Sequence, residues 1–312
     1  MDNLEGRLAV VTGGGSGIGR ALVRHLAALG CSVATCDINA ESAQATVGLA
    51  LADAPPATTV SGHHCDVSDP AQVERFRDEV LATHRRGHIN LLINNAGVGG
   101  GGSFLTGSRV EWERTFAITW GGVYLCTRAF TPALVASDAG YLVNVSSVNG
   151  FWASLGPGVP HTAYSAAKFA VKGFTESLLE DFRLHAPHVR VAVVMPGHIG
   201  TDIGANSIRI HAGDTSEAEM MAAARARMER RGLPTADLSD EQVNALIEEF
   251  VTRFRDNAPT TAEQAAQTIV DGIRTGQWRI LIGDDAHRLD ERVRADPVTM
   301  YGPQGIGLGS IG

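Results

Sequence analysis

Tyr164 and Lys168 are the residues whose types and spacing most directly suggest acid–base chemistry. The segment Tyr164-Ser165-Ala166-Ala167-Lys168 places a phenol and an ammonium four residues apart, and hence on one face of a helix. A tyrosine with an ordinary pKa near 10 is a poor base at neutral pH, and each unit of lowering takes about 1.36 kcal/mol of preferential stabilisation of the phenolate. A neighbouring cation supplies such stabilisation. The spacing is also frequent by chance, so a helix-surface pair is the alternative interpretation.

A glycine-rich segment near the start of the chain could bind a phosphate group. Residues 12–19 read T-G-G-G-S-G-I-G between an expected strand and an expected helix. In this context backbone N–H groups and a helix N-terminus can bind a pyrophosphate. Gly13, Gly17 and Gly19 allow the backbone to turn and to approach the ligand closely. An ordinary strand-to-helix turn is the alternative for a single glycine-rich segment.

Asp37 stands at the end of the second expected strand, about 20 residues after the loop, where a carboxylate can accept hydrogen bonds from adenosine ribose hydroxyls. This position favours NAD. A 2′-phosphate would meet the charge of Asp37, and Ser16, Ile38 and Asn39 supply no arginine or lysine for an NADP site. A helix N-cap before Ala40 is the alternative role for Asp37.

Strands and helices that alternate along the chain must position these groups. The strands are expected at 7–11, 31–36, 58–65, 89–93, 140–145, 189–195 and 278–282. Helices are expected at 18–29, near 40–51, from Asp69-Pro70, from about Ser108, at 162–185 and at 262–275. The alternation predicts βαβ units, and therefore an α/β fold with one doubly wound (Rossmann) seven-stranded parallel sheet.

Two segments depart from this alternation. Between about 204 and 258, Ser216-x-x-Glu219 and Ser239-x-x-Gln242 predict two capping boxes and two extra helices. We expect them to form a helical substrate flap inserted after the sixth strand. Residues 1–301 are then a single catalytic domain, and the Gly-rich tail 302–312 is expected to be disordered.

Composition excludes several classes of protein. The formal net charge is −8, so a nucleic acid or an anionic membrane is an unfavourable partner. The apolar runs fall short of the roughly 18 residues of a membrane span, and we expect neither a signal peptide nor a membrane helix. Four cysteines without a C-x-x-C pair predict reduced, buried thiols and a cytoplasmic protein. The histidines lack metal-ligand spacing, so no metal site is expected.

From about residue 4 to 282 the chain resembles a short-chain dehydrogenase/reductase. The motifs that carry the resemblance stand in the family's order: Gly13-x-x-x-Gly17-x-Gly19, Asp66-Val67, Asn94-Asn95-Ala96-Gly97, Asn144-Val145-Ser146-Ser147, Tyr164-x-x-x-Lys168 and Pro196-Gly197-x-x-x-Thr201. The resemblance implies an NAD-binding site made by Gly13, Gly15, Ser16, Gly17, Ile18, Gly19, Asp37, Ile38, Asp66, Val67, Asn95, Ala96, Gly97, Tyr164, Lys168, Pro196, Gly197, Ile199 and Thr201. Members are usually dimers or tetramers, so a homodimer or homotetramer is implied.

The resemblance also implies catalytic roles. Tyr164 is the general acid/base, and Lys168 lowers its pKa and holds the nicotinamide ribose. Ser147 hydrogen-bonds the substrate oxygen and stabilises the charge that develops there. Ser147 is chosen over Ser146 because the family's serine usually precedes a small hydrophobic residue, which here is Val148.

Position 119 departs from the family pattern. Thr119 stands where members usually have the asparagine that positions a proton-relay water. A threonine hydroxyl both donates and accepts but reaches less far, so Thr119 is either a relay group or a buried helix residue.

The loop before Tyr164 contains Phe151, Trp152, Pro157, Pro160 and His161, which we expect to form one wall of the substrate pocket.

The sequence therefore predicts an NAD(H)-dependent oxidoreductase that interconverts a secondary alcohol and a ketone. The aromatic loop and the flap favour a medium or large, mostly apolar substrate. A physiological reductase of a ketone or quinone-like compound is one alternative. A catalytically weak NAD(H)-binding regulator or scaffold is the other, and Thr119 is the feature that favours it.

Overall fold

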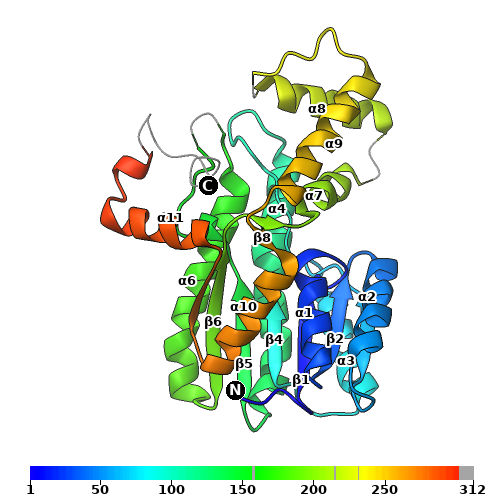
Figure 1. Cartoon of the computed structure of the whole chain (residues 1–312), viewed down its shortest axis with the longest axis vertical. Helices are drawn as coiled ribbons and strands as arrows, with labels where there is room; N and C mark the ends of the chain where they lie inside the picture. The colour runs from blue at the N-terminus through cyan, green and yellow to red at the C-terminus, as the bar shows by residue number, and fades with distance from the viewer. Residues whose placement is uncertain (157–158, 214–215, 231, 302–312) are drawn as a thin grey trace.

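A central parallel sheet organises the structure, a computed structural model that describes residues 1–156, 159–213, 216–230 and 232–301 (Figure 1). Its strands are β1 (Leu8–Thr12), β2 (Ser32–Asp37), β3 (Val60–His64), β4 (Leu91–Asn94), β5 (Gly140–Val145), β6 (Val189–Pro196) and β9 (Arg279–Ile282). Their order is β3-β2-β1-β4-β5-β6-β9, and every neighbouring pair is parallel. This confirms the predicted seven-stranded doubly wound sheet.

Helices cover both faces of the sheet, which explains why its central strands are almost wholly apolar. On one face, the sheet packs against α1 (Gly17–Ala28), α2 (Ala40–Asp53) and α10 (Ala262–Thr275). On the other face it packs against α3 (Pro70–His84), α5 (Gly122–Val135) and α6 (Thr162–His185). All five residues of β1 are buried, as expected for a strand between two helical layers.

Helix ends follow the capping signals of the sequence. Asp69 caps α3 by accepting from the backbone N–H groups of Ala71 and Gln72, with Pro70 in the first turn. Ser108 caps α4 (Arg109–Phe116), which continues through the π-helical turn η1 (Ala117–Gly121) directly into α5. The observed bounds of α6 and α10 are those predicted. A capping box of Thr261 with Gln264 starts α10, whereas α6 starts without a side-chain cap.

The insertion after β6 forms α7 (Ile203–Ala212), α8 (Glu217–Arg230) and α9 (Asp240–Asp256). Both predicted capping boxes are present, at Ser216 with Glu219 and at Ser239 with Gln242. A short pair, β7 (Ile199–Gly200) and β8 (Thr260–Thr261), joins the two ends of the insertion. Figure 1 shows these helices beyond the carboxyl ends of the sheet strands.

Several elements were not predicted. They are α7, the pair β7 and β8, α11 (Asp284–Ala295) and the 3-10 turns η2 (Val148–Gly150) and η3 (Thr299–Tyr301). α7 and α11 start without a side-chain cap. The Gly-rich tail 302–312 lies outside the described residues.

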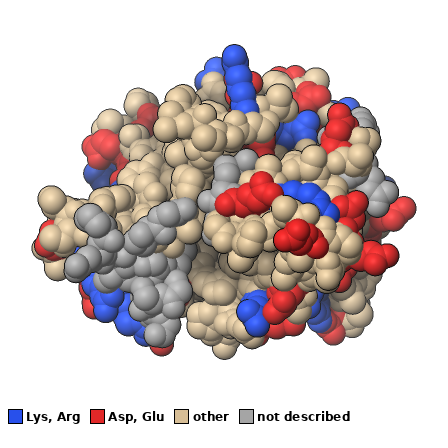
Figure 2. Space-filling view, turned by 90° about the horizontal axis from the view of Figure 1, so that it is seen from above, with Lys and Arg blue, Asp and Glu red and all other residues tan. Residues whose placement is uncertain are grey.

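Surface charge, helix hydrophobicity and cysteine burial are the properties that the composition led us to predict. Figure 2, which views the flap end from above, shows acidic and basic side chains interspersed on that face. Among the described residues, the helices are too short or too polar to cross a bilayer. All four cysteines are buried free thiols, as predicted.

Candidate active site

Ser147, Tyr164 and Lys168 come together at the carboxyl end of β5. Ser147 is the second residue after this strand, and its hydroxyl accepts from the backbone N–H of Asn149 at 3.1 Å. Tyr164 and Lys168 lie in the first two turns of α6, on the helical face that their spacing predicts. The Lys168 Nζ lies 5.5 Å from the centre of the Tyr164 ring and donates to the Val145 carbonyl at 2.8 Å.

Burial acts on the acid–base properties of this pair in opposite senses. It raises the pKa of Tyr164, because the phenolate loses hydration, while the nearby Ser147 side chain favours a lower value. Burial lowers the pKa of Lys168 to about 7, because an ammonium is costly inside the protein. A base made from Tyr164 therefore requires further positive charge in the cleft.

The two adjacent serines have different environments. The Ser146 hydroxyl is buried and donates to the Lys168 carbonyl at 2.8 Å, so it joins β5 to α6. The Ser147 side chain instead acts on Tyr164. This arrangement supports Ser147, rather than Ser146, as the residue that would contact a substrate oxygen.

The glycine loop packs against the segment after β4. Gly13 has φ of +68°, and a Cβ there would lie 2.8 Å from the Ala96 Cα. At Gly19 a Cβ would lie 2.0 Å from the Gly13 carbonyl oxygen, so a side chain is excluded. Asn95 closes the arrangement by donating its Nδ2 to the Thr12 carbonyl at 3.0 Å. The loop backbone is thus held at the N-terminus of α1, where it fits a pyrophosphate.

Asp37 lies at the end of β2 beside this loop. Its Oδ2 accepts from the Gly15 N–H at 2.9 Å, and its Oδ1 accepts from the Asn39 N–H at 3.0 Å. The neighbouring Ile38 is exposed. In the next strand connection, Asp66 accepts from the N–H and hydroxyl of Ser68, and Val67 is buried.

The remaining expected cofactor contacts lie in segments that pack near the glycine loop, Lys168 or β9. A Cβ on Gly17 would approach the Thr201 side chain at 3.1 Å, and a Cβ on Gly97 would lie 3.6 Å from the Lys168 Nζ. The Gly197 N–H is bonded to the Ile282 carbonyl, which joins the turn after β6 to β9. Ser16 and Ile18 belong to the glycine loop, Pro196 ends β6 and Ile199 begins β7.

Thr119 occupies a buried position in η1, and its hydroxyl forms hydrogen bonds with the backbone of Val98. Its Oγ1 donates to the Val98 carbonyl at 3.1 Å and accepts from the Val98 N–H at 3.2 Å. The side chain therefore fastens the segment after β4 to the π-helical turn. This geometry supports the buried-helix interpretation rather than a relay group, because the single hydroxyl proton is already used.

The prediction that the loop before Tyr164 forms one wall of the substrate pocket is partly wrong. Trp152 is 0% exposed and packs with Ala286, Leu289 and Met300 beneath α11, so it belongs to the core. Phe151 packs against the same cluster. Pro157 lies outside the described residues.

An open groove of about 730 Å³ is lined by Ala153, Pro160, His161, Ala166, Phe169 and Tyr301, among others. The His161 ring lies against the Tyr164 ring, with 4.7 Å between their centres. Its described lining does not include Ser147, Tyr164 or Lys168, because Ala166 and Phe169 stand on the opposite face of α6. The groove presents mainly apolar surface and approaches Tyr164 through the His161 ring.

Two further residues were missed. Asn206 of α7 donates to the Ser16 hydroxyl at 3.0 Å, which ties the flap to the glycine loop. Asp285 accepts from the His198 N–H at 2.7 Å in the turn after β6. Each contact joins residues more than 80 positions apart, and the residues carried no motif that could have identified them.

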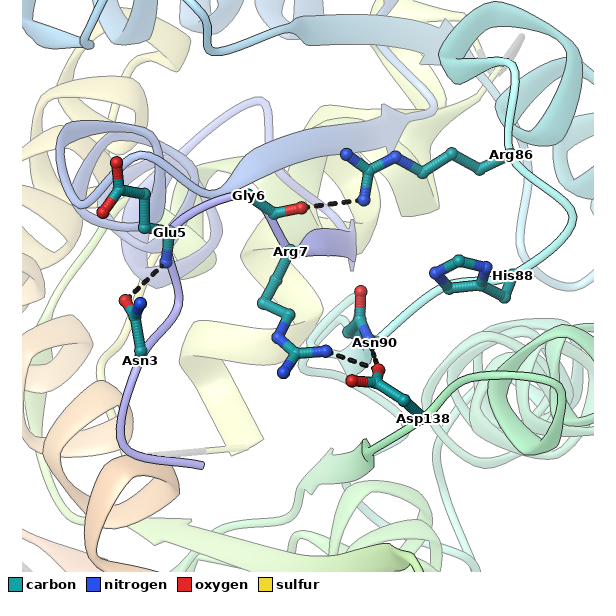
Figure 3. Close-up of a pocket in the computed structure, with 8 residues that line it drawn as sticks. All are labelled: Asn3, Glu5, Gly6, Arg7, Arg86, His88, Asn90 and Asp138. Carbon is teal, nitrogen blue, oxygen red and sulfur yellow. Dashed lines mark hydrogen bonds and ion pairs between the residues drawn. The ribbon is translucent and has the colours of Figure 1, made fainter.

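A second cavity, of about 440 Å³, lies at the opposite end of the sheet (Figure 3). Its polar lining includes Arg7, which pairs with Asp138, and Arg86, which donates to the Gly6 carbonyl. It adjoins the amino ends of β1 and β4. Ligands of doubly wound sheets bind at the carboxyl ends, so this cavity is not the candidate site.

Comparison with known proteins gives the same assignment. The family model "short chain dehydrogenase" matches residues 7–210. SadH of Mycobacterium tuberculosis is 33% identical over 294 residues, which cover 94% of this chain and 92% of that protein. A (3R)-3-hydroxyacyl-CoA dehydrogenase of Mus musculus is 34% identical over 203 residues, which cover 64% of this chain and 76% of that protein.

A solved structure adds similarity over nearly the full length. A short chain dehydrogenase/reductase from Burkholderia phymatum, in complex with NAD, superimposes with a TM-score of 0.76 at 27% identity. The match covers 98% of this chain and 99% of that one. The family match spans both the glycine loop and the Ser147, Tyr164 and Lys168 group described above. The chain belongs to the short-chain dehydrogenase/reductase family of oxidoreductases.

Proposed function

We propose that this protein is an NAD(H)-dependent dehydrogenase/reductase that interconverts a secondary alcohol and a ketone. The observation that carries the proposal is the convergence of Ser147, Tyr164 and Lys168 beside the glycine loop. One group is a titratable hydroxyl, one is a buried cation and one is a hydrogen-bond donor. Together they suit the removal of a proton from an alcohol whose carbon loses a hydride.

NAD is the proposed cofactor because Asp37 supports it. Its carboxylate lies against the Gly15 N–H, where it would accept from ribose hydroxyls and repel a 2′-phosphate. The similar Burkholderia structure was solved with NAD. The proposed NAD contacts are Gly13, Gly15, Ser16, Gly17, Ile18, Gly19, Asp37, Ile38, Asp66, Val67, Asn95, Ala96, Gly97, Tyr164, Lys168, Pro196, Gly197, Ile199 and Thr201.

Bound NAD would supply the hydride acceptor and a positive charge in the cleft. Tyr164 then takes the hydroxyl proton of the alcohol, and Ser147 donates a hydrogen bond to the same oxygen. Lys168 stabilises the phenolate and would hold the nicotinamide ribose. In the reverse direction Tyr164 returns the proton to the ketone oxygen.

The proposed substrate is medium to large and mostly apolar. The groove lined in part by His161, whose ring lies against the Tyr164 ring, offers apolar surface from Pro160, Ala166 and Phe169. Two relatives are named as a (3R)-3-hydroxyacyl-CoA dehydrogenase of Mus musculus and an epidermal retinol dehydrogenase of Homo sapiens. We also propose that the protein is a homodimer or homotetramer, which light scattering tests. The cytoplasm is the proposed location, because the four buried thiols stay reduced there.

The test measures cofactor absorbance during turnover with NAD and with NADP, over secondary alcohols from small polar to bulky apolar. We expect NAD-dependent oxidation that favours apolar alcohols. Tyr164→Phe should lower kcat by about 10²–10⁴-fold, the usual contribution of a general acid/base, without loss of NADH binding. Equal activity of Tyr164→Phe would refute its role.

A regulatory protein is the second candidate, favoured by the engagement of the Thr119 hydroxyl with Val98. Tight NADH binding without turnover of any alcohol or matching ketone would support it. Turnover limited to ketones would instead favour the reductase. Either result would replace the dehydrogenase proposal.

A further inference from the structure

The turn after β6 is held by two elements that lie beyond the family match at 7–210. The His198 N–H donates to the Asp285 Oδ2 of α11 at 2.7 Å. The His198 ring forms a hydrogen bond through Nε2 with the Phe254 carbonyl of α9 at 2.7 Å, and the two rings lie 4.4 Å apart between centres. The C-terminal part of the chain therefore sets the position of this turn.

Asp285 is a buried carboxylate that the acid–base chemistry above does not use. It is 7% exposed, and within the described part of the chain its Oδ1 has no hydrogen-bond partner. A Cβ on Gly197 would lie 2.3 Å from this Oδ1, and a Cβ on Gly283 would lie 2.4 Å from it. The carboxylate thus lies directly against the backbone of the turn, where only glycine leaves it room.

We propose that Asp285 is a positioning residue for this turn and that its negative charge favours oxidised over reduced nicotinamide. This inference rests on the proposed NAD function, in which Gly197, Ile199 and Thr201 contact the nicotinamide. By accepting the His198 N–H, Asp285 holds the backbone between these contacts. The first turn of α11 favours a negative charge at this place through the helix dipole.

The charge distinguishes this role from a structural one. The nicotinamide ring is positive in NAD⁺ and neutral in NADH. A buried negative charge near the ring attracts only the oxidised form, and it does so more strongly than it would in water. A residue that merely shaped the turn would affect the binding of both forms equally.

The test measures the dissociation constants of NAD⁺ and NADH by calorimetry, without substrate. Asp285→Asn keeps an oxygen for the His198 N–H but removes the charge. We expect NAD⁺ binding to weaken at least about fivefold more than NADH binding. Asp284→Asn is the matched control, because it removes an exposed carboxylate from the same helical turn and should leave the ratio unchanged.

Equal weakening of both forms, or no change in either, would overturn the proposal. Wild-type protein that binds neither form would overturn the proposed NAD function itself, which is a separate result. If Asp285→Asn does not fold, hydrogen exchange on the wild type provides a second measurement. Slow exchange of the His198 amide in cofactor-free protein supports the positioning role, and exchange at the rate of an unprotected amide overturns it.

Discussion

Replacement of Lys168 by methionine should stabilise the cofactor-free protein, although the lysine is proposed to serve catalysis. Lys168 is 4% exposed, and burial lowers its pKa from the usual 10.5 to about 7. Methionine has a similar length and carries no charge. We therefore expect Lys168→Met to remove a cost of folding and to abolish alcohol oxidation.

The magnitude follows from the pKa difference. The pKa falls by 10.5 − 7, or about 3.5 units, and at about 1.36 kcal/mol per unit the cost of burying the cation is at most about 5 kcal/mol. The variant also loses the hydrogen bond from Nζ to the Val145 carbonyl, which offsets about 1–3 kcal/mol. The expected net gain in the free energy of unfolding is about 2–4 kcal/mol at pH 6.

The gain must depend on pH in a defined direction. Below about pH 7, Lys168 is protonated in the folded and unfolded states alike, so the folded state carries the whole cost. Between pH 7 and 10.5 the folded state loses this proton first, and the cost disappears as pH rises. The advantage of Lys168→Met should therefore shrink between pH 7 and 10.

Urea unfolding of both proteins, measured from pH 6 to pH 10, tests this reasoning. Lys172→Met is the control, because Lys172 lies one turn along α6 and pairs with Glu176 at 2.8 Å. Its replacement removes a lysine that is not fully buried. A stability difference for Lys168→Met that stays constant over this pH range would refute the argument from burial.

Three further predictions concern the cofactor site and the core. Asp37→Ser should weaken NAD binding at least about tenfold, because charged hydrogen bonds to the ribose are lost. It should also reduce the ratio of the affinity for NAD to the affinity for NADP. Fluorescence titration measures both, and an unchanged preference would contradict the assignment. Thr119→Val should destabilise the protein by about 1–3 kcal/mol in urea unfolding, because the buried Val98 N–H loses its partner; loss of turnover with unchanged stability would instead identify Thr119 as a relay group. Trp152→Ala should cost about 3–5 kcal/mol in thermal or urea unfolding, as for a large core side chain, and a change confined to KM would return Trp152 to the pocket wall.

Local interactions explain what could be predicted from the sequence. The cap at Asp69 and the capping boxes at Ser216, Ser239 and Thr261 depend on residues within one helical turn of each other. The alternation of strands and helices predicts a parallel sheet, and the carboxyl ends of its strands meet at one edge. The motifs at these ends therefore converge in the cleft.

Contacts between distant segments decided the rest. Three contacts join residues that no local pattern links. They are the packing of Trp152 under α11, the hydrogen bonds between Thr119 and Val98, and the hydrogen bond from the His198 N–H to Asp285. The sequence by itself determined the alternation of strands and helices and the glycine loop, because each depends on neighbouring positions, and it predicted Ser147, Tyr164 and Lys168 as the catalytic group. Only the tertiary structure decided which polar groups are buried and what they contact, because burial is a property of segments brought together by folding.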